Sequence, residues 1–245
     1  MTDVTDKQLP LGAGVDAADV AVVPAATTIV LRGDPFEVLL MRRHERSTFV
    51  PGSWVFPGGA VEDGDRKAAK AMGLGEDILS VMKISAVREL FVETGIWPAA
   101  APDDLPKRRE TLLHAGDGFA DLFSKYPVDL DRLVWTARWI TPSGVRKRYD
   151  TYFFLAQVPE NAEATPDERE GVEVVWLTPG AALDRHRRGE LPMVFPTMKN
   201  LEAIAGHVSA VALLSDRRNA DVKTTRPILV VEGGQKKIIL PDGPS

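Results

Sequence analysis

Two glutamates, Glu89 and Glu93, lie four residues apart in a segment whose apolar spacing is typical of a helix. At about 100° per residue they project from one stripe, opposite the apolar stripe that includes Leu90 and Phe91. Such a pair is usually a solvated face that tolerates a repulsion of about 0.2–0.5 kcal/mol. Two exposed carboxylates one turn apart also suit Mg²⁺, which takes one or two carboxylates and keeps several waters. The spacing therefore indicates either a surface patch or a cation site.

The segment VPGSWVFPGGAVEDGD, residues 50–65, precedes this helix and has an unusual order of residue types. A strand-like stretch ends at Pro57, two glycines follow, and acidic residues come next. One interpretation is a tight loop. The other is a loop whose backbone carbonyl and acids are held around a cation, together with the two glutamates.

These residues resemble the Nudix hydrolase box, Gly-x5-Glu-x7-Arg-Glu-U-x-Glu-Glu-x-Gly-U, in which U is aliphatic. Its second half matches at six positions: Arg88, Glu89, Leu90, Glu93, Gly95 and Ile96. In the first half, Gly59 matches the first glycine, and Asp65 stands where the first glutamate is usual. The spacer from Arg66 to Val87 is far longer than seven residues. Val92 replaces the first glutamate of the later pair.

An insertion at this position is similar to the Nudix branch that includes peroxisomal coenzyme A diphosphatases. The segments VLLMRRHERSTFVPGSWVFPGG, ARWITPSGVRKRYDTYFFLA and IILPDG look like that branch too. The resemblance runs from about Val20 to nearly the end of the chain. It implies an α+β Nudix fold, an α/β/α sandwich with a mixed sheet and a helical insertion.

The resemblance also implies roles for the acidic residues. Glu89 and Glu93 would bind Mg²⁺ or Mn²⁺, and Glu89 would orient or deprotonate the attacking water. The carbonyl of Gly59, or of its neighbour Gly58, would be a further ligand, because glycine lets the backbone approach an ion closely.

Further acidic and basic residues complete the implied site. Arg88 would pair with Asp65 and orient the helix, which is a structural role. Nudix enzymes often place another catalytic or metal-binding glutamate shortly before a strand that contains tryptophan. Glu170 is the first candidate for that role and Glu173 the second. Either residue could instead be a solvated loop side chain.

Basic residues cluster at positions 42–43, 146–148 and 185–188. Beside an acidic metal site such a cluster would suit a phosphorylated substrate, although most clusters of this kind are solvated faces. Arg42, Arg148 and Glu173 are the candidate substrate contacts, and a salt bridge within the fold is an equal alternative for Arg148.

The composition is that of an ordinary globular protein: 245 residues, 44% hydrophobic, 27% charged, with a net charge of −5. This charge does not favour nucleic acid or anionic membranes as partners. The absence of cysteine excludes disulfides, cysteine nucleophiles and thiolate metal sites. No apolar run approaches about 18 residues, so we expect no membrane span and a cytoplasmic location.

The hydrophobic pattern predicts alternating strands and helices in a mixed order. Strands are expected at 20–33, 36–43, 53–57, 132–141, 148–158 and 172–178, with a hairpin at 226–240. Helices are expected at 76–95, 179–190 and 195–214. We expect a flexible leader at 1–19 and one domain at 20–245, with insertions at about 66–84 and 98–131.

The expected activity is divalent-metal-dependent hydrolysis of a nucleoside diphosphate linked to another moiety. Coenzyme A or acyl-coenzyme A is the first candidate substrate, and ADP-ribose, NADH and nucleotide sugars are alternatives. Because Val92 removes a carboxylate, a catalytically silent nucleotide-binding protein is the rival interpretation. The apolar segment 201–214 could pack within the domain or form a homodimer.

Overall fold

The computed structural model describes residues 20–75, 77–99, 105–115, 119–232 and 235–241. The predicted leader, residues 1–19, lies outside this part of the chain. The same holds for residues 100–104 and 116–118 of the second predicted insertion and for Gly233 and Gly234 within the predicted hairpin.

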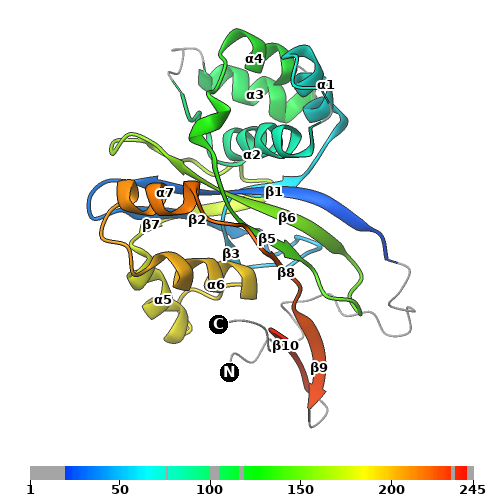
Figure 1. Cartoon of the computed structure of the whole chain (residues 1–245), viewed down its shortest axis with the longest axis vertical. Helices are drawn as coiled ribbons and strands as arrows, with labels where there is room; N and C mark the ends of the chain where they lie inside the picture. Colours follow the sequence, from blue (N-terminus) through cyan, green and yellow to red (C-terminus); the bar gives the residue numbers. More distant parts are fainter. Residues whose placement is uncertain (1–19, 76, 100–104, 116–118, 233–234, 242–245) are drawn as a thin grey trace.

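The described residues form strands and helices in a mixed order (Figure 1). The strands are β1 (Val22–Arg32), β2 (Glu37–Arg43), β3 (Trp54–Val55), β4 (Gly58–Ala60), β5 (Val134–Ile140), β6 (Arg148–Gln157), β7 (Gly171–Leu177), β8 (Thr224–Thr225), β9 (Ile228–Glu232) and β10 (Gln235–Ile239). The helices are α1 (Asp63–Ala71), α2 (Ile78–Thr94), α3 (Leu105–Ala115), α4 (Phe119–Lys125), α5 (Pro179–Arg187), α6 (Phe195–Ile204) and α7 (Ala210–Arg218), with a 3-10 turn at Leu130–Arg132.

Strand β1 lies at the centre of a mixed sheet with the order β3-β2-β1-β6-β5-β8. It runs antiparallel to β2 and β4 and parallel to β6, while β7 extends the sheet beside β2. The predicted pair of long strands is confirmed, since β5 and β6 are antiparallel neighbours. The predicted C-terminal hairpin is confirmed by the antiparallel pairing of β9 with β10.

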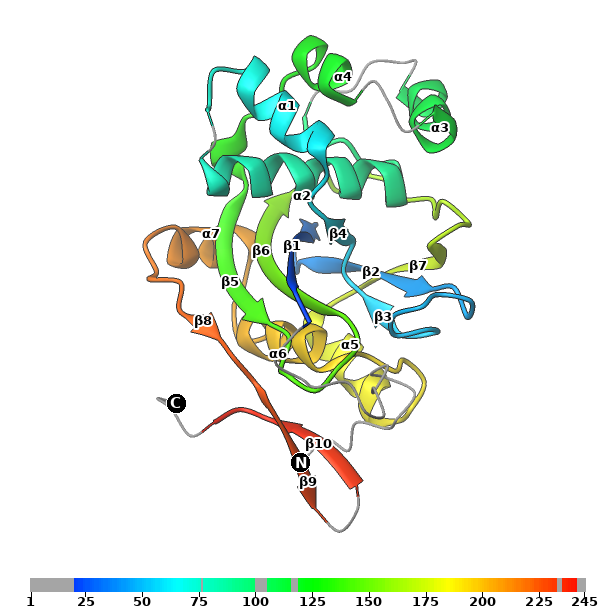
Figure 2. The same ribbon diagram turned by 90° about the vertical axis from the view of Figure 1, so that its right-hand side faces the viewer.

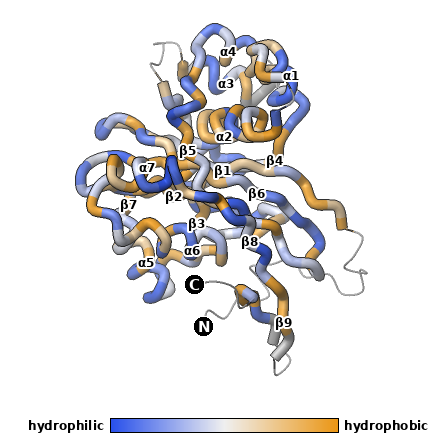
Figure 3. Tube along the Cα trace, in the orientation of Figure 1, coloured by the Kyte–Doolittle hydropathy of each residue, from blue (hydrophilic) through white to orange (hydrophobic). Residues whose placement is uncertain are grey.

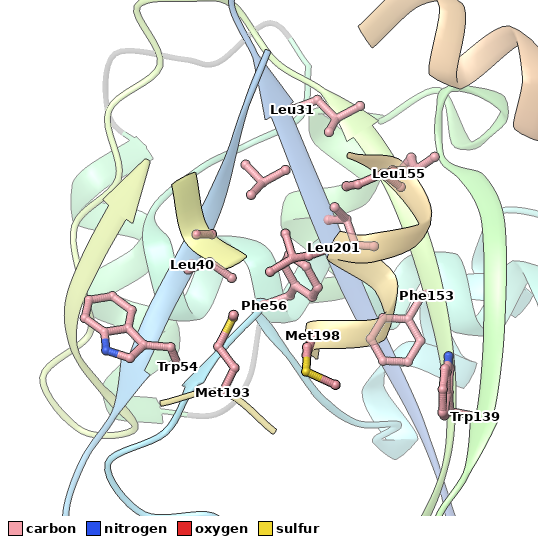
Figure 4. Close-up of a cluster of buried hydrophobic side chains, with 14 of the residues drawn as sticks. Leu31, Leu40, Trp54, Phe56, Trp139, Phe153, Leu155, Met193, Met198 and Leu201 are labelled. Carbon is pink, nitrogen blue, oxygen red and sulfur yellow. The ribbon is translucent and has the colours of Figure 1, made fainter. Parts of the chain in front are cut away.

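Helices cover both faces of this sheet (Figure 2). Alternate residues of β1 divide between two cores, as the two-residue period of a strand requires. Ile29 and Leu31 pack with the α5–α7 layer. Figure 4 shows Leu31 and Leu201 in this core. On the opposite face, Ala26 packs with Val87 of α2. The predicted α+β sandwich with a mixed sheet is therefore confirmed.

Helix α2 carries the sequence motif, and its predicted existence and ends are confirmed. The Asp77 side chain caps its start by accepting a hydrogen bond from the Ser80 N–H at 2.8 Å. Gly95 ends it with φ of +76°, and its N–H donates to the Phe91 carbonyl at 2.8 Å. The helix lies between the sheet and helices α1, α3 and α4, and Figure 3 shows it as largely apolar.

The expectation that Glu89 and Glu93 would face water is wrong. Glu93 is only 2% exposed, and the Glu89 side chain is 13% exposed. The reason is tertiary, because the stripe opposite the apolar core packs against β4. The helical pattern alone could not reveal this neighbour.

Two local predictions also need correction. The glycines after Pro57 do not form a simple turn, because Gly58–Ala60 pairs as β4 with Ala25–Thr27 of β1. The predicted helix at 195–214 is two helices, α6 and α7, separated at residues 205–209.

Helix α1 overlaps the first stretch predicted as an insertion, and α3 and α4 overlap the second. They gather on one side of α2, at the opposite end of the molecule from the β9–β10 hairpin (Figures 1 and 2). That these stretches are insertions in a single domain stays a prediction. Among the described residues, no helix combines the length and hydrophobicity needed to cross a membrane.

Candidate active site

The two glycines of β4 allow that strand to lie directly against the carboxylates of α2. The Gly58 N–H donates to Glu93 Oε2 at 2.7 Å. A Cβ atom on Gly59 would overlap the Glu89 carboxylate, and one on Gly58 would overlap Thr27 and the Ala26 backbone. Any larger residue at either position would push β4 away from β1 or α2.

The strand also determines which glycine carbonyl faces the glutamates. Gly59 pairs with Ala26 in the β1 ladder, whereas the Gly58 N–H and the Ala60 carbonyl contact side chains of α2. Backbone groups of an antiparallel strand alternate between its two edges. The Gly59 carbonyl is therefore directed to β1, and the carbonyl of Gly58 shares the side of Ala60. Of the two predicted carbonyl ligands, Gly58 is the one placed toward Glu93.

Arg88 and Asp65 form the predicted pair. Arg88 Nε lies 2.8 Å from Asp65 Oδ1, and Arg88 Nη2 lies 3.0 Å from Asp65 Oδ2. The same guanidinium donates to the Ala60 carbonyl at 2.9 Å and to Glu89 Oε1 at 3.0 Å. Burial alone would lower the pKa of Arg88, but its bonds to Asp65 and the nearby Glu89 charge raise that pKa. One cation thus joins α1, α2 and β4 and fixes one oxygen of Glu89.

The Glu89 and Glu93 carboxyl groups both have raised pKa values. Burial is the largest cause at Glu89 and raises its pKa to about 7, against the lowering effect of Arg88. Burial also raises the pKa of Glu93 well above its usual range, and the charges of Glu89 and Glu170 raise it further. The site therefore holds closely spaced acids whose negative charges are only partly balanced by the protein.

One oxygen of this pair is left without a partner. Glu93 Oε1 is buried and makes no hydrogen bond to any described residue, although buried carboxylate oxygens are normally bonded. The described residues hold no group of three or more His, Cys, Asp or Glu side chains placed to bind an ion. Two carboxylates and a carbonyl nevertheless fit Mg²⁺ or Mn²⁺, because a hard cation of this type completes its shell with water and substrate oxygens.

Glu89, Gly58 and Gly59 line a cavity of about 570 Å³. Its other walls come from the loop after β2, from β5 and β6, and from the start of α6. Apolar and aromatic side chains form much of the lining: Phe49, Val55, Phe56, Trp139, Ile140, Tyr149, Phe153, Phe195 and Ile238. The cavity therefore combines an acidic end with a partly apolar body, as sites for small organic ligands usually do.

Glu170 lies on this cavity, in the loop before β7. Its Oε2 atom lies 3.4 Å from Arg43 Nη2. The Asp167 carboxylate accepts hydrogen bonds from the N–H groups of Glu170 and Gly171, at 3.1 and 2.8 Å. A short loop stabilised in this way brings a third carboxylate to the wall that carries Glu89.

The three predicted substrate contacts do not lie on the cavity. Arg42 and Glu173 pair with each other across β2 and β7, with Nε and Oε2 2.9 Å apart. Arg148 donates to the carbonyls of Thr141 and Val20, at 3.2 and 3.4 Å. This corrects the expectation for all three residues, and for Arg148 the fold supplies backbone partners instead of a salt bridge.

Their sequence neighbours line the cavity instead. Arg43 and Lys147 do so, together with Tyr149. Neighbouring residues of a strand point to opposite faces, so a basic cluster can be correctly located while the wrong member is chosen. Arg46 and Arg169 also line the cavity and were missed, because no spacing pattern distinguishes loop residues that face inward.

Comparisons with known proteins find Nudix hydrolases among the similar sequences and structures. The chain is 27% identical to putative nudix hydrolase 7 of Caenorhabditis elegans, over 74% of this chain and 60% of that protein. A crystal structure of a NUDIX hydrolase from Alicyclobacillus acidocaldarius shares 29% identity and a TM-score of 0.71, over 80% of this chain and 97% of that one. No protein-family model matches the chain. The chain resembles Nudix hydrolases and has the Nudix fold.

Other proteins similar to this chain are named acyl-coenzyme A diphosphatases. The chain is 25% identical to human NUDT19, an acyl-coenzyme A diphosphatase, over 71% of this chain and 62% of that protein. The Xenopus laevis protein of the same name is 23% identical, over 62% and 55%. The chain thus spans about 60% of the length of the curated relatives it matches. The predicted resemblance to the coenzyme A diphosphatase branch is confirmed.

Proposed function

We propose that the chain is a divalent-metal-dependent diphosphatase that hydrolyses a nucleoside diphosphate linked to another moiety. In the reaction, water attacks one phosphorus, the bridging P–O bond breaks, and two phosphorylated fragments leave. The observation that carries this proposal is the buried pair Glu89 and Glu93 against the glycine strand β4, with one Glu93 oxygen unpartnered.

Glu93, Glu89 and the Gly58 carbonyl are the groups that would hold Mg²⁺ or Mn²⁺. When bound there, the ion would offset the charge of the diphosphate and lower the pKa of a water. The same ion would compensate the two carboxylates, whose burial is otherwise unfavourable.

Side chains of the protein would orient the attacking water, accept its proton and hold the metal ligands in place. Glu89 lines the cavity, and its carboxylate would orient the attacking water or accept a proton from it. Arg88 holds Glu89 Oε1 and, through Asp65, fixes α2 against α1. Glu170 on the neighbouring loop would orient water or contribute to metal binding. The unbonded state of Glu93 Oε1 is consistent with the metal role assigned to that residue.

Coenzyme A and acyl-coenzyme A are the first substrates to test. Two observations support this choice: relatives named acyl-coenzyme A diphosphatase, and a cavity lined by both acidic and apolar side chains. ADP-ribose, NADH and nucleotide sugars have the same diphosphate linkage and remain the alternatives.

Val92 favours a second candidate, a nucleotide-binding protein without turnover. Its apolar side chain stands where a carboxylate is usual in the Nudix box, so α2 supplies two carboxylates at the motif instead of three. Glu170 lies on the same cavity and offers a replacement acid, which is why the enzyme is our first proposal.

The test is turnover with purified protein, Mg²⁺ or Mn²⁺, and a panel of coenzyme A, an acyl-coenzyme A, ADP-ribose, NADH and a nucleotide sugar. We expect two phosphorylated products from at least one substrate and none after chelation of the metal. Glu89→Gln should reduce turnover by about 10²–10⁴-fold. Glu202→Gln, on the exposed side of α6, is the control and should retain activity.

Binding of a nucleotide without product release from any substrate would favour the silent protein. Activity that survives Glu89→Gln would show that the site is wrongly assigned, even if a diphosphatase is present.

A further inference from the structure

The acidic residues that line the cavity all have cationic neighbours. Glu89 and Glu62 lie 3.0 and 3.7 Å from Arg88 Nη1, and Glu170 lies 3.4 Å from Arg43 Nη2. These acids and their arginines belong to the end of the cavity formed by α2, β4 and the loop before β7. At that end, Arg88 and Arg43 are therefore already paired with carboxylates of the protein before an ion or a substrate enters.

Two exposed cations on the same cavity have no such compensation. Arg46 and Lys147 both line it, and neither forms an ion pair with any residue in the described part of the chain. The Lys147 Nζ atom donates instead to Thr48 Oγ1 at 3.1 Å. Positive charge therefore remains available on this wall.

The wall that carries these cations is formed by two segments held together. Lys147 lies just before β6, and its bond to Thr48 joins it to the loop after β2, which also contains Arg46. The rings of Phe49 and Tyr149 meet edge to face at 5.2 Å across the same junction, and both rings line the cavity. The junction thus brings Lys147, the Thr48 hydroxyl and two aromatic rings together on the cavity, and Arg46 lines the same cavity from the loop that contains Thr48.

These cations, the hydroxyl and the aromatic rings are more binding groups than a single diphosphate needs. At the other end, the diphosphate would meet the metal ligands, Arg43 and Arg169. Lysine and arginine beside a hydroxyl suit a second phosphate, which accepts several charge-assisted hydrogen bonds. Aromatic rings next to them suit the base of a nucleoside.

We propose that Arg46 and Lys147 bind a phosphomonoester on the nucleoside part of the substrate, separate from the diphosphate that is cleaved. This inference rests on the proposed function, and it narrows the substrate class to nucleoside diphosphate derivatives that carry an additional ribose phosphate. Coenzyme A and NADPH have such a phosphate, whereas dephospho-coenzyme A and NADH lack it.

The experiment compares kcat/KM for coenzyme A and dephospho-coenzyme A, and for NADPH and NADH, in Mg²⁺. For each pair that is hydrolysed, we expect the wild-type kcat/KM to be about tenfold higher for the member with the additional ribose phosphate. The difference should lie in KM, because a charge-assisted contact at an exposed site strengthens substrate binding. Arg46→Ala and Lys147→Ala should each move this ratio toward one. Arg146→Ala removes an adjacent exposed charge that does not line the cavity, and its ratio should stay at the wild-type value.

A binding measurement separates this inference from the proposed function. Calorimetry with adenosine 3′,5′-bisphosphate and AMP should show about tenfold tighter binding of the bisphosphate, lost in Lys147→Ala. If no substrate is hydrolysed but this preference is present, the diphosphatase proposal is wrong and the phosphate site stands.

If hydrolysis occurs without any preference in turnover or binding, the phosphate site is wrong and the diphosphatase stands. Equal losses for both members of a pair in Arg46→Ala and Lys147→Ala would also overturn it, because they would indicate general electrostatic attraction. High salt should weaken the preference, since exposed charges are screened over about 10 Å at 0.1 M.

Discussion

The cavity has two walls that differ in how the chain builds them. On the wall of α2 and β4, the Arg88–Asp65 pair is buried and doubly hydrogen-bonded, and glycines allow close backbone contact. On the wall of the loop after β2, Arg46 and Lys147 are exposed and Lys147 has a single hydroxyl partner. The first wall is preorganised before ligand binds, which is what electrostatic catalysis requires. The second can adapt to the bound molecule.

This difference predicts that substitutions on the first wall damage the fold, whereas those on the second change selectivity. The following predictions test that division, beginning with the largest expected effect.

Arg88→Ala should reduce the free energy of unfolding by about 3–5 kcal/mol, because it leaves the fully buried Asp65 carboxylate without its partner. Chemical denaturation of the two proteins measures this difference. Lys83→Ala is the control on the same helix. Its only described ion pair is a 4.0 Å contact to the exposed Asp131, so it should change stability by less than about 1 kcal/mol. Similar values for both variants would contradict a preorganised wall.

The buried carboxylates should make the metal-free protein less stable as pH rises. Burial raises the pKa of Glu89 from 4.5 to about 7, so between these values the folded protein binds more protons than the unfolded chain. The free energy of unfolding therefore falls through this window, by about 2–3 kcal/mol for this one group. Glu93 is shifted in the same direction, so the loss should continue at higher pH.

Thermal unfolding in a chelator, from about pH 5 to about pH 8, measures this slope. It should be shallower in Glu89→Gln, and excess Mg²⁺ should reduce it in the wild-type protein, because the ion binds the deprotonated carboxylates. A wild-type slope unaffected by the substitution would show that other groups control it.

Gly59→Ala should destabilise the protein by about 1–3 kcal/mol and strongly reduce activity, because its Cβ would overlap the Glu89 carboxylate. The matched control is Gly64→Ala in α1, where a Cβ would meet no atom within 4 Å. Alanine favours a helix over glycine, so this control should be neutral or slightly stabilising. Equal tolerance of both changes would mean that β4 does not lie against Glu89 in solution.

The sequence predicted the first wall better than the second for a physical reason. Helix α2, its glycine end and the Arg88–Asp65 pair follow from local patterns and from the resemblance to the Nudix box. The position of Gly58–Ala60 as a strand, and the burial of Glu93, depend on pairing with β1, which no local pattern encodes. The metal ligands and catalytic roles stay predictions.

The basic residues illustrate the same limit. The sequence indicated positions 42–43 and 146–148 as clusters that could meet a phosphate, and one member of each, Arg43 and Lys147, lines the cavity. Whether Arg42 or Arg43 faces the cavity depends on the register of β2 with β7, which shifts between these two residues. Such a shift is a tertiary property, so the residue choice could not be made from the chain alone.

The smallest effect is expected at Arg109, which connects a helix beyond the motif to the first wall. Its Nε donates to the Val92 carbonyl at 3.0 Å, and its Nη1 and Nη2 donate to Thr165 Oγ1 and O, both at 2.8 Å. Thr165 lies in the loop between β6 and β7 that carries Glu170, and its N–H donates to the Thr94 carbonyl at 2.9 Å. We therefore expect Arg109 to position the loop that carries Glu170, because it links that loop to α2.

Arg109→Ala should lower kcat by about tenfold with little change in KM, since the loop that presents Glu170 loses two hydrogen bonds and its link to the Val92 carbonyl of α2, while the phosphate contacts remain. Arg109→Lys should recover only part of the loss, because an ammonium cannot bridge the same three acceptors. In a Glu170→Gln background, Arg109→Ala should cause little further loss, because both changes act on one group. Fully additive losses of kcat in the double variant would show that Arg109 supports the fold in general. The division between a rigid catalytic wall and an adaptable binding wall would then not extend to α3.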